Sequence, residues 1–205
     1  MALPQRTLVI LGLGLIGGSL ARALRASGFC QQFVGCGYRE PSLRRGVELG
    51  VIDEFTLDLD EALARADILV ICTPTLTASD VLDTILPRLG DDGPVVTDAA
   101  SVKGNLRDAA LRINGGVMPS RFVLGHPIAG SERSGVDASN ADLFVNHRVI
   151  LTPEAGNAAD AISLVRAMWE SAGAEVVEMD VDTHDRVLAC LLYTSPSPRD
   201  LNPNL

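Results

Sequence analysis

Two segments contain a serine and a histidine that could act together in proton transfer. Ser101 belongs to DAASVKG at 98–104 and His126 to GHPIAGSERSG at 125–135, and each segment follows a predicted strand. The carboxyl ends of parallel strands meet at one edge of a sheet, where ligands bind. A neutral imidazole there can accept a proton from a substrate hydroxyl, and a neighbouring hydroxyl can orient it. His126 is therefore the candidate base and Ser101 its orienting partner, although Ser101 could also simply cap the next helix.

The sequence GLGLIG at 12–17 matches the G-x-G-x-x-G pattern of dinucleotide-binding turns. The pattern alone is weak, but here it directly follows a predicted strand and opens a helix. Gly12 would permit the tight turn, Gly14 the approach of a pyrophosphate, and Gly17 the close packing of helix on strand. Leu15 and Ile16 begin the helix, whose free N–H groups would meet the phosphate charge. A glycine-rich turn without a ligand is the alternative.

Residues after two further strands bear on which dinucleotide would bind. An acidic residue at the end of the second strand binds the ribose hydroxyls of NAD, whereas an arginine suits the 2′-phosphate of NADP. The expected acidic position holds Gly37, with Arg39 and then Glu40 following it. Arg39 could equally face solvent, so the sequence leaves NAD or NADP open. Thr73 and Pro74, just past the strand at 67–72, are expected to line the cofactor cleft.

Such a site needs strands that end at one edge, and the sequence predicts alternating strands and helices. Apolar runs predict strands over 7–11, 33–36, 67–72, 94–97, 122–124, 149–152 and 175–179. Helices are predicted over 14–27, 41–49, 60–65, 79–89, 103–113, 158–172 and 184–190. Strands that are apolar throughout are typical of a parallel sheet covered on both faces. The predicted fold is α/β, with a doubly wound, mostly parallel Rossmann-type sheet and helices on both faces.

The composition is typical of a globular protein in a reducing compartment. Of its 205 residues, 47% are hydrophobic and 21% are charged. The formal net charge of −9 argues against nucleic acid and anionic membranes as partners. No apolar run reaches the roughly 20 residues of a membrane helix. The four cysteines (Cys30, Cys36, Cys72 and Cys190) lack metal-site spacing, so free thiols in a cytoplasmic protein without a metal are expected.

Four segments, taken in order, resemble the prephenate/arogenate (cyclohexadienyl) dehydrogenase family. They are GLGLIGGSLA at 12–21, DAASVKG at 98–104, GHPIAGSERSG at 125–135, and His184-Asp185. The GHPIAGSE part is highly specific, whereas the glycine motif alone would not be. The resemblance covers about residues 7–190.

The resemblance implies an NAD(P)-dependent oxidoreductase that oxidatively decarboxylates prephenate, arogenate or both, in the biosynthesis of tyrosine. Hydride would leave the ring carbon that bears the hydroxyl and pass to the nicotinamide. His126 would accept the hydroxyl proton, and Ser101 would orient His126. Ser131 and Glu132 would line the substrate site.

The predicted organisation is a dinucleotide-binding domain at 1–181, followed at 182–190 by the start of a helical dimerisation domain. In the family that domain supplies a second active-site histidine, an arginine and the homodimer interface. Most of it is absent here, so we expect a fragment with poor turnover. Residues 191–205 depart from the family pattern, contain three prolines, and are expected to be a disordered or foreign tail that ends the helix.

The sequence contains two other histidines and leaves two other functions open. His147 is expected on the surface, and His184 at a helix start or an interdomain contact rather than in catalysis. Another small-substrate dehydrogenase or imine reductase of the same fold is one alternative function, which the GHPIAGSE segment disfavours. The other is a non-catalytic dinucleotide-binding module, which a genuine chain end at Leu205 would favour.

Overall fold

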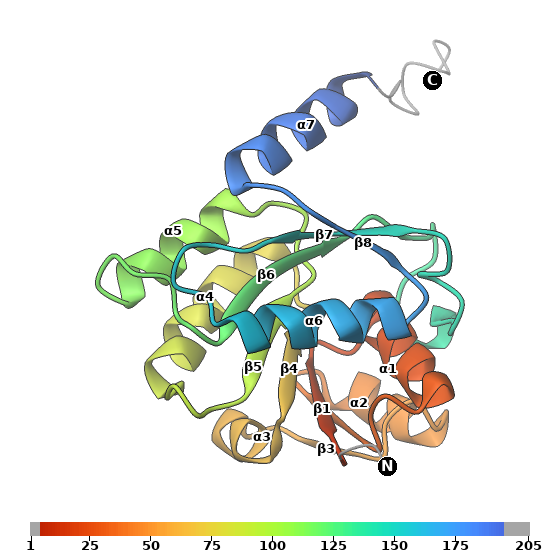
Figure 1. Cartoon of the computed structure of the whole chain (residues 1–205). Helices are drawn as coiled ribbons and strands as arrows, with labels where there is room; N and C mark the ends of the chain where they lie inside the picture. The colour runs from red at the N-terminus through yellow and green to blue at the C-terminus, as the bar shows by residue number, and fades with distance from the viewer. Residues whose placement is uncertain (1–4, 195–205) are drawn as a thin grey trace.

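The computed structural model describes residues 5–194, leaving aside the side chains of 75–77 and 190–194. Within these residues one eight-stranded sheet runs through the molecule, with helices on both sides (Figure 1). The strands are β1 (Thr7–Leu11), β2 (Gln32–Cys36), β3 (Glu54–Thr56), β4 (Ile68–Ile71), β5 (Val95–Asp98), β6 (Phe122–Pro127), β7 (Arg148–Thr152) and β8 (Glu175–Glu178). The helices are α1 (Leu15–Ser27), α2 (Glu40–Glu48), α3 (Leu59–Arg65), α4 (Thr75–Ile85), α5 (Gly104–Ile113), α6 (Ala159–Ser171) and α7 (Val181–Thr194).

The strand order is β3-β2-β1-β4-β5-β6-β7-β8. The strands from β3 to β6 are parallel to their neighbours, β7 runs antiparallel to β6, and β8 is parallel to β7. The first six positions have the 3-2-1-4-5-6 order of a Rossmann fold. The prediction of a doubly wound, mostly parallel sheet is therefore confirmed. In such sheets ligands bind beyond the carboxyl ends of the strands, where the order reverses between β1 and β4.

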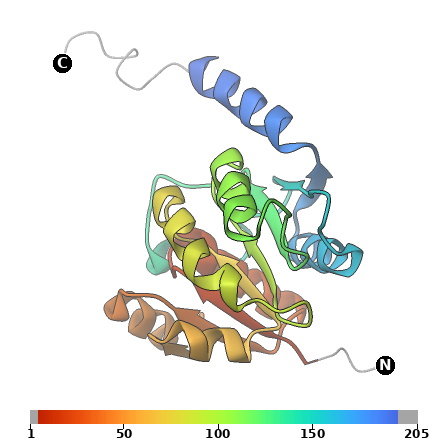
Figure 2. The same cartoon turned by 90° about the vertical axis from the view of Figure 1, so that its left-hand side faces the viewer.

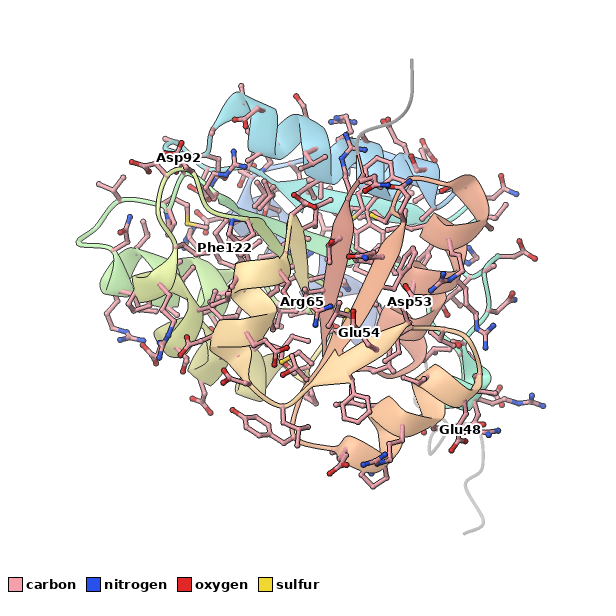
Figure 3. The ribbon with its side chains drawn as sticks, turned by 90° about the horizontal axis from the view of Figure 1, so that it is seen from below. Glu48, Asp53, Glu54, Arg65, Asp92 and Phe122 are labelled. Atoms are coloured by element: carbon pink, nitrogen blue, oxygen red, sulfur yellow. The ribbon has the colours of Figure 1, made fainter. Side chains whose placement is uncertain are left out.

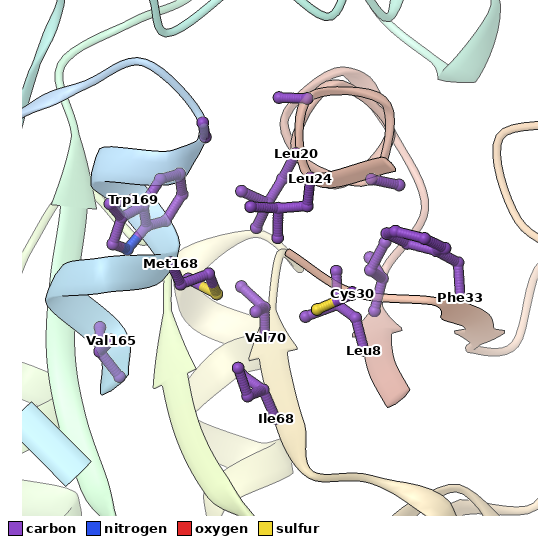
Figure 4. Packing of buried hydrophobic residues seen from close by; sticks show 14 of the residues in the cluster. Leu8, Leu20, Leu24, Cys30, Phe33, Ile68, Val70, Val165, Met168 and Trp169 are labelled. Carbon is purple, nitrogen blue, oxygen red and sulfur yellow. The ribbon is translucent and has the colours of Figure 1, made fainter. Parts of the chain in front are cut away.

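Both faces of the sheet are buried because helices cover each of them. Successive side chains of a strand point to opposite faces, and β1 shows this clearly. Leu8 and Ile10 belong to a cluster with residues of α1 and α6, including Trp169 (Figure 4). Val9 and Leu11 belong to a second cluster with residues of α3, α4 and α5. The apolar strands of the sequence follow directly from this two-sided burial.

Charged side chains hold the edge strand β3. Glu54 of β3 pairs with Arg65 of α3, and both are visible in the view from below (Figure 3). Asp53, just before β3, accepts hydrogen bonds from Phe33 N and from Arg25, each 2.8 Å long. These groups are partly exposed, so each ion pair contributes little to stability. They lie away from the carboxyl ends of the strands, where the site is built.

Three predicted elements differ from the structure by more than one residue at an end. β6 continues through His126 and Pro127 because these residues pair with Ile150 and Val149 of the antiparallel β7. His126 therefore lies within a strand, not just past one. α4 begins at Thr75 directly after its N-cap Pro74, rather than at residue 79, and its last predicted turn is a 3-10 helix over Leu86–Arg88.

The third difference concerns α7, which begins at Val181 and ends at Thr194. The prediction that the helix stops before residue 191 is wrong, since the first four residues of the predicted tail are helical. The first proline of the tail is residue 196, and a proline disfavours helical conformation at the residue directly before it. Residues up to 194 can therefore remain helical. The rest of that tail lies outside the described residues. Figures 1 and 2 show α7 projecting from the body beyond its first turn.

No helix among the described residues is both long and apolar enough to cross a membrane.

Candidate active site

The turn between β1 and α1 brings three strand ends together. Gly12 has a φ of +93°, a conformation that L side chains rarely adopt. Its N–H donates to Cys36 O at the end of β2 (3.0 Å). A Cβ on Gly12 would lie 2.9 Å from Thr73 N, just past β4. A glycine is therefore required for the backbone to pass between the ends of β2 and β4.

The other two glycines of the motif differ sharply in the space around them. A Cβ on Gly14 would meet nothing within 4 Å, so the backbone is open on that side. A Cβ on Gly17 would lie 2.6 Å from Ile10 Cγ2 and 3.1 Å from Gly12 O. Gly17 thus lets α1 pack against β1, whereas Gly14 leaves room for a ligand to approach the main chain.

The amino end of α1 suits an anion. No side chain caps this end, and its first turn contains no acidic residue. The first N–H groups of a helix have no acceptor within the helix, and they carry partial positive charge. Leu15 and Ile16 lie in this first turn. Among the described residues Thr73 Oγ1 is buried without a hydrogen-bond partner, so a polar group is also offered by the neighbouring strand end.

The end of β2 opens on a second part of the cleft. A cavity of about 340 Å³ is lined there by Gly37, Tyr38 and Asp80, among others. Arg39 is exposed and is the N-cap residue of α2, while Glu40 pairs with Arg44 one turn later in α2. Glu40 is thereby engaged within its own helix. Pro74 is exposed at the start of α4.

A larger, mainly apolar cavity of about 760 Å³ lies beyond the ends of β5 and β6. His126 lines it together with Ser101, His147, Asp185 and Leu188. The cavity is therefore shared by the loop after β5, the end of β6 and the first turns of α7. His147 is exposed, as predicted, but it borders the same cavity as His126.

Behind His126 a chain of three side chains leads into α7. His126 Nδ1 lies 2.9 Å from His184 Nε2, and His184 Nδ1 lies 2.7 Å from Asp185 Oδ1. His126 is 9% exposed and His184 is fully buried. His184 lies in the first turn of α7, as expected, and its ring also contacts that of the candidate base directly.

Asp185 also holds α7 against α5. Its Oδ1 accepts from Lys103 N (2.9 Å) and its Oδ2 from Gly104 N (2.8 Å). Lys103 is the N-cap residue of α5, and its own side chain makes no capping bond. Asp185 thus supplies the cap from another helix, and its charge meets the positive end of α5. A Cβ on Gly104 would lie 2.9 Å from Asp185 Oδ2, so the glycine permits this approach.

Burial sets the protonation states of these three groups. Burial, reinforced by the charge of Lys103, lowers the pKa of His126 to about 3. Burial also lowers the pKa of His184, although the Asp185 carboxylate opposes that change. For Asp185, burial would raise the pKa, but the N–H groups of Lys103 and Gly104 and the His184 ring hold it below its ordinary value. At neutral pH both rings are therefore uncharged and Asp185 is ionised.

A buried ion pair lies beneath this chain. Lys103 is the single lysine of the sequence, and its fully buried Nζ pairs with Asp98 and donates to Gly125 O (2.6 Å). Asp98 also accepts from Ala100 N (2.9 Å) and Gly125 N (3.1 Å). Burial lowers the pKa of Lys103, while Asp98 raises it. The pair fastens the loop after β5 to the strand that carries His126.

Comparison with known proteins identifies the family. The family model described as "Prephenate dehydrogenase, nucleotide-binding domain" matches residues 20–178, more than half of the chain. The chain belongs to the prephenate dehydrogenase family. The cyclohexadienyl dehydrogenase of Zymomonas mobilis is 35% identical over 187 residues, which are 89% of this chain and 61% of that protein. The prephenate dehydrogenase of Bacillus subtilis is 32% identical over 91% of this chain and 50% of its own length.

Solved structures agree with this membership. A crystal structure of prephenate dehydrogenase from A. aeolicus, in complex with hydroxyphenyl propionate and NAD+, is 32% identical with a TM-score of 0.81. The two structures align over 97% of this chain and 73% of the A. aeolicus chain. Synechocystis arogenate dehydrogenase is 31% identical with a TM-score of 0.80, over 90% of this chain and 63% of its own. An imine reductase from Pseudomonas sp., 16% identical, shares the fold alone.

This member of the prephenate dehydrogenase family spans about half the length of the curated relatives it matches. It includes their nucleotide-binding domain, as the match of the family model shows. The match begins at residue 20, so the glycine turn at 12–17 rests on its own geometry.

The structure brings together some of the predicted site residues and not others. Ser101 is exposed and lines the cavity of His126, but no hydrogen bond joins the two among the described residues. In this arrangement the side chain that contacts the His126 ring is His184. Ser131 and Glu132 are exposed beyond the residues that line the cavity, and Ser131 accepts a hydrogen bond from Arg133 N (3.1 Å).

The sequence analysis assigns no site role to four residues of this region. They are Asp98, Lys103, His184 and Asp185, which interlock through the contacts above. The clearest overlooked signal was Lys103, because a lone lysine between two strand ends in a chain with 16 other basic residues, all arginine, stands out.

The three cysteines within the described side chains are free, as predicted. Burial raises the pKa of Cys30 and Cys72 to about 12 and that of Cys36 to about 11. Their thiols therefore stay protonated and unreactive at neutral pH. The side chain of Cys190 lies outside the description.

Proposed function

We propose that this chain is the nucleotide-binding part of a cytoplasmic enzyme of tyrosine biosynthesis that oxidatively decarboxylates prephenate, arogenate or both. The observation that carries the proposal is His126: an uncharged imidazole at a strand end, facing a mainly apolar cavity. Membership of the prephenate dehydrogenase family supplies the substrate class.

His126 would accept the proton of the substrate hydroxyl. Bound NAD or NADP would take the hydride from the carbon that bears this hydroxyl. Loss of the ring carboxylate as CO₂ then makes the ring aromatic, which favours the overall reaction. The mainly apolar cavity favours loss of charge, since a carboxylate is poorly solvated there. The residues of this chain position and deprotonate, while the cofactor supplies the redox chemistry.

The glycine turn supports a dinucleotide at the carboxyl ends of β1 and β4. Gly14 leaves open space beside the uncapped end of α1, where a pyrophosphate would accept hydrogen bonds from Leu15, Ile16 and Gly17. Thr73, next to Gly12, adds a buried hydroxyl without a hydrogen-bond partner among the described residues. At the end of β2, Gly37 carries no carboxylate and Arg39 is free to meet a 2′-phosphate, so we propose that NADP is accepted as well as NAD.

The remaining half of the relatives' length would carry the other substrate contacts and the homodimer interface. We therefore propose that the 205-residue chain binds dinucleotide but turns over slowly by itself. Ser131 and Glu132, which lie beyond the cavity lining here, would reach the substrate only in the longer protein.

Two measurements test the proposal. Titration calorimetry of the chain with NAD+ and with NADP+ should show that both bind. If neither binds, the proposed dinucleotide site is wrong; if only NAD+ binds, the proposed acceptance of NADP is wrong. Absorbance of the reduced nicotinamide should then be followed with prephenate and with arogenate, using a longer protein that contains this chain. His126→Asn should abolish the rate there, whereas His147→Asn, at the rim of the same cavity, should retain most of it.

A further inference from the structure

We propose that Asp185 and His184 form a proton relay behind His126, in which Asp185 fixes the tautomer of both rings and His184 takes up the charge. The identity of the hydroxyl that starts the relay rests on the proposed function. The arrangement of protons on the two rings rests on contacts within this chain, and it can be tested without substrate.

The tautomers follow from the contacts one after another. Asp185 is ionised and receives two backbone N–H groups, so it can only accept from His184. His184 Nδ1 must therefore carry the proton, and in the uncharged ring Nε2 has only a lone pair. That lone pair, 2.9 Å from His126 Nδ1, can only accept. His126 consequently carries its proton on Nδ1, which leaves the lone pair of its Nε2 for the cavity.

The linked side chains His126, His184 and Asp185 also explain how His126 can act as a base although its pKa is low. Burial and the charge of Lys103 make a positive His126 costly, so it would hold a proton weakly by itself. In the relay the substrate O–H proton moves to His126 Nε2 while the His126 Nδ1 proton moves to His184 Nε2. His126 stays uncharged throughout, in the opposite tautomer. The positive charge rests on His184, whose Nδ1 still donates to the Asp185 carboxylate 2.7 Å away.

The surrounding charges favour His184 over His126 as the final site. The groups that face the two rings are Asp185 on α7, Lys103 at the start of α5, and Asp98 at the end of β5. Lys103 opposes a charge on either ring, whereas Asp98 and the directly bonded Asp185 both favour a charge on His184.

The test reads the ring protons directly. The chain contains three histidines, so two-bond 1H–15N correlations of histidine-labelled protein give few signals, and His147→Gln identifies the remaining two. In the unchanged chain at neutral pH, Nδ1 should be protonated and Nε2 unprotonated in both His126 and His184. His184→Leu removes the acceptor, so His126 should shift at least partly to the Nε2–H form. His184→Gln should restore the Nδ1–H form, because its carbonyl oxygen can accept from His126 Nδ1.

Three outcomes would overturn the relay: a His126 proton on Nε2 in the unchanged chain, no change in His184→Leu, or no recovery in His184→Gln. The first decides the matter even if His184→Leu does not fold. A residue that only filled space would not hold one tautomer, so the readout separates positioning from packing. If prephenate or arogenate were not oxidised while these tautomers were observed, the proposed function would fail and the relay would stand.

Discussion

Replacing Lys103 by methionine should destabilise the protein strongly, because it leaves a buried carboxylate without its countercharge. Lys103 and Asp98 are both 0% exposed. Methionine has nearly the same length and shape as the lysine stem, so little packing volume is lost. What disappears is the ammonium group and its hydrogen bond to Gly125 O.

The magnitude follows from what remains around Asp98. Two backbone donors, Ala100 N and Gly125 N, still reach its oxygens at 2.9 and 3.1 Å, but no cation does. Breaking a buried pair by removing one partner costs about 3–5 kcal/mol. Replacing both partners by uncharged residues is often close to neutral. Asp98→Asn combined with Lys103→Met should therefore recover about 2–3 kcal/mol of the loss.

Urea unfolding provides the assay, since Trp169 is the single tryptophan and is fully buried in α6. Its fluorescence should report global unfolding, and Trp169 itself is not part of the altered ion pair. Arg112→Met on α5 is the matched control: Arg112 pairs with Asp83, both half-exposed or more, so its loss should cost at most about 1 kcal/mol.

The reasoning would be refuted by either of two results. One is a Lys103→Met variant within about 1 kcal/mol of the unchanged chain, which would mean that Asp98 needs no countercharge. The other is a double variant no more stable than Lys103→Met, which would place the loss in packing rather than in the stranded charge.

Three further predictions concern other parts of the site. Between pH 6.5 and about 3 the unfolded chain binds a proton at residue 126 that the folded chain does not, so stability is lost as the pH falls. His126→Gln should reduce the slope of the free energy of unfolding against pH in this range by up to about 1.4 kcal/mol per pH unit, measured by urea unfolding. An unchanged slope would contradict this, and His147→Gln is the control. Gly14→Ala should change the free energy of unfolding by no more than about 0.5 kcal/mol but weaken NAD+ binding at least about tenfold in calorimetry. Gly17→Ala should lower the free energy of unfolding by about 1–3 kcal/mol. Equal effects of the two substitutions on stability and binding would contradict the roles assigned to the two glycines. Cys30 and Cys36, which are buried, and Cys72, which is partly buried, should resist a thiol reagent in the native protein and react on unfolding, with the labelled sites mapped by peptide mass. Rapid native labelling at Cys72 would argue against the raised pKa of its thiol.

The sequence allowed the fold to be predicted because its signals are local. Apolar runs marked the buried strands, and the spacing of Gly12, Gly14 and Gly17 marked the turn that begins α1. Each of these patterns depends on a few neighbouring residues. The length of β6 could not be predicted in the same way, because His126 joins that strand only through pairing with the distant β7.

The contact between His126 and His184 could not be predicted, for a related reason. The sequence favours Ser101 as the orienting residue because its segment follows a strand end, and it places His184 at a helix start or an interdomain contact. The contact between residues 126 and 184 arises because β7 and β8 return the chain to the end of β6, where α7 begins. No local pattern encodes that return.

The same contacts bear on where the nucleotide-binding domain ends. A boundary after residue 181 would assign His126 to one domain, and His184 and Asp185, to which it is linked, to the next. It would also remove the carboxylate that receives Lys103 N and Gly104 N, and losing a helix cap costs about 1 kcal/mol. Asp185 therefore serves the first domain as a cap and the site as an anchor. We propose that the physical boundary lies after the first turn of α7, because His184 and Asp185 in that turn make their side-chain contacts with His126, Lys103 and Gly104 of the sheet domain.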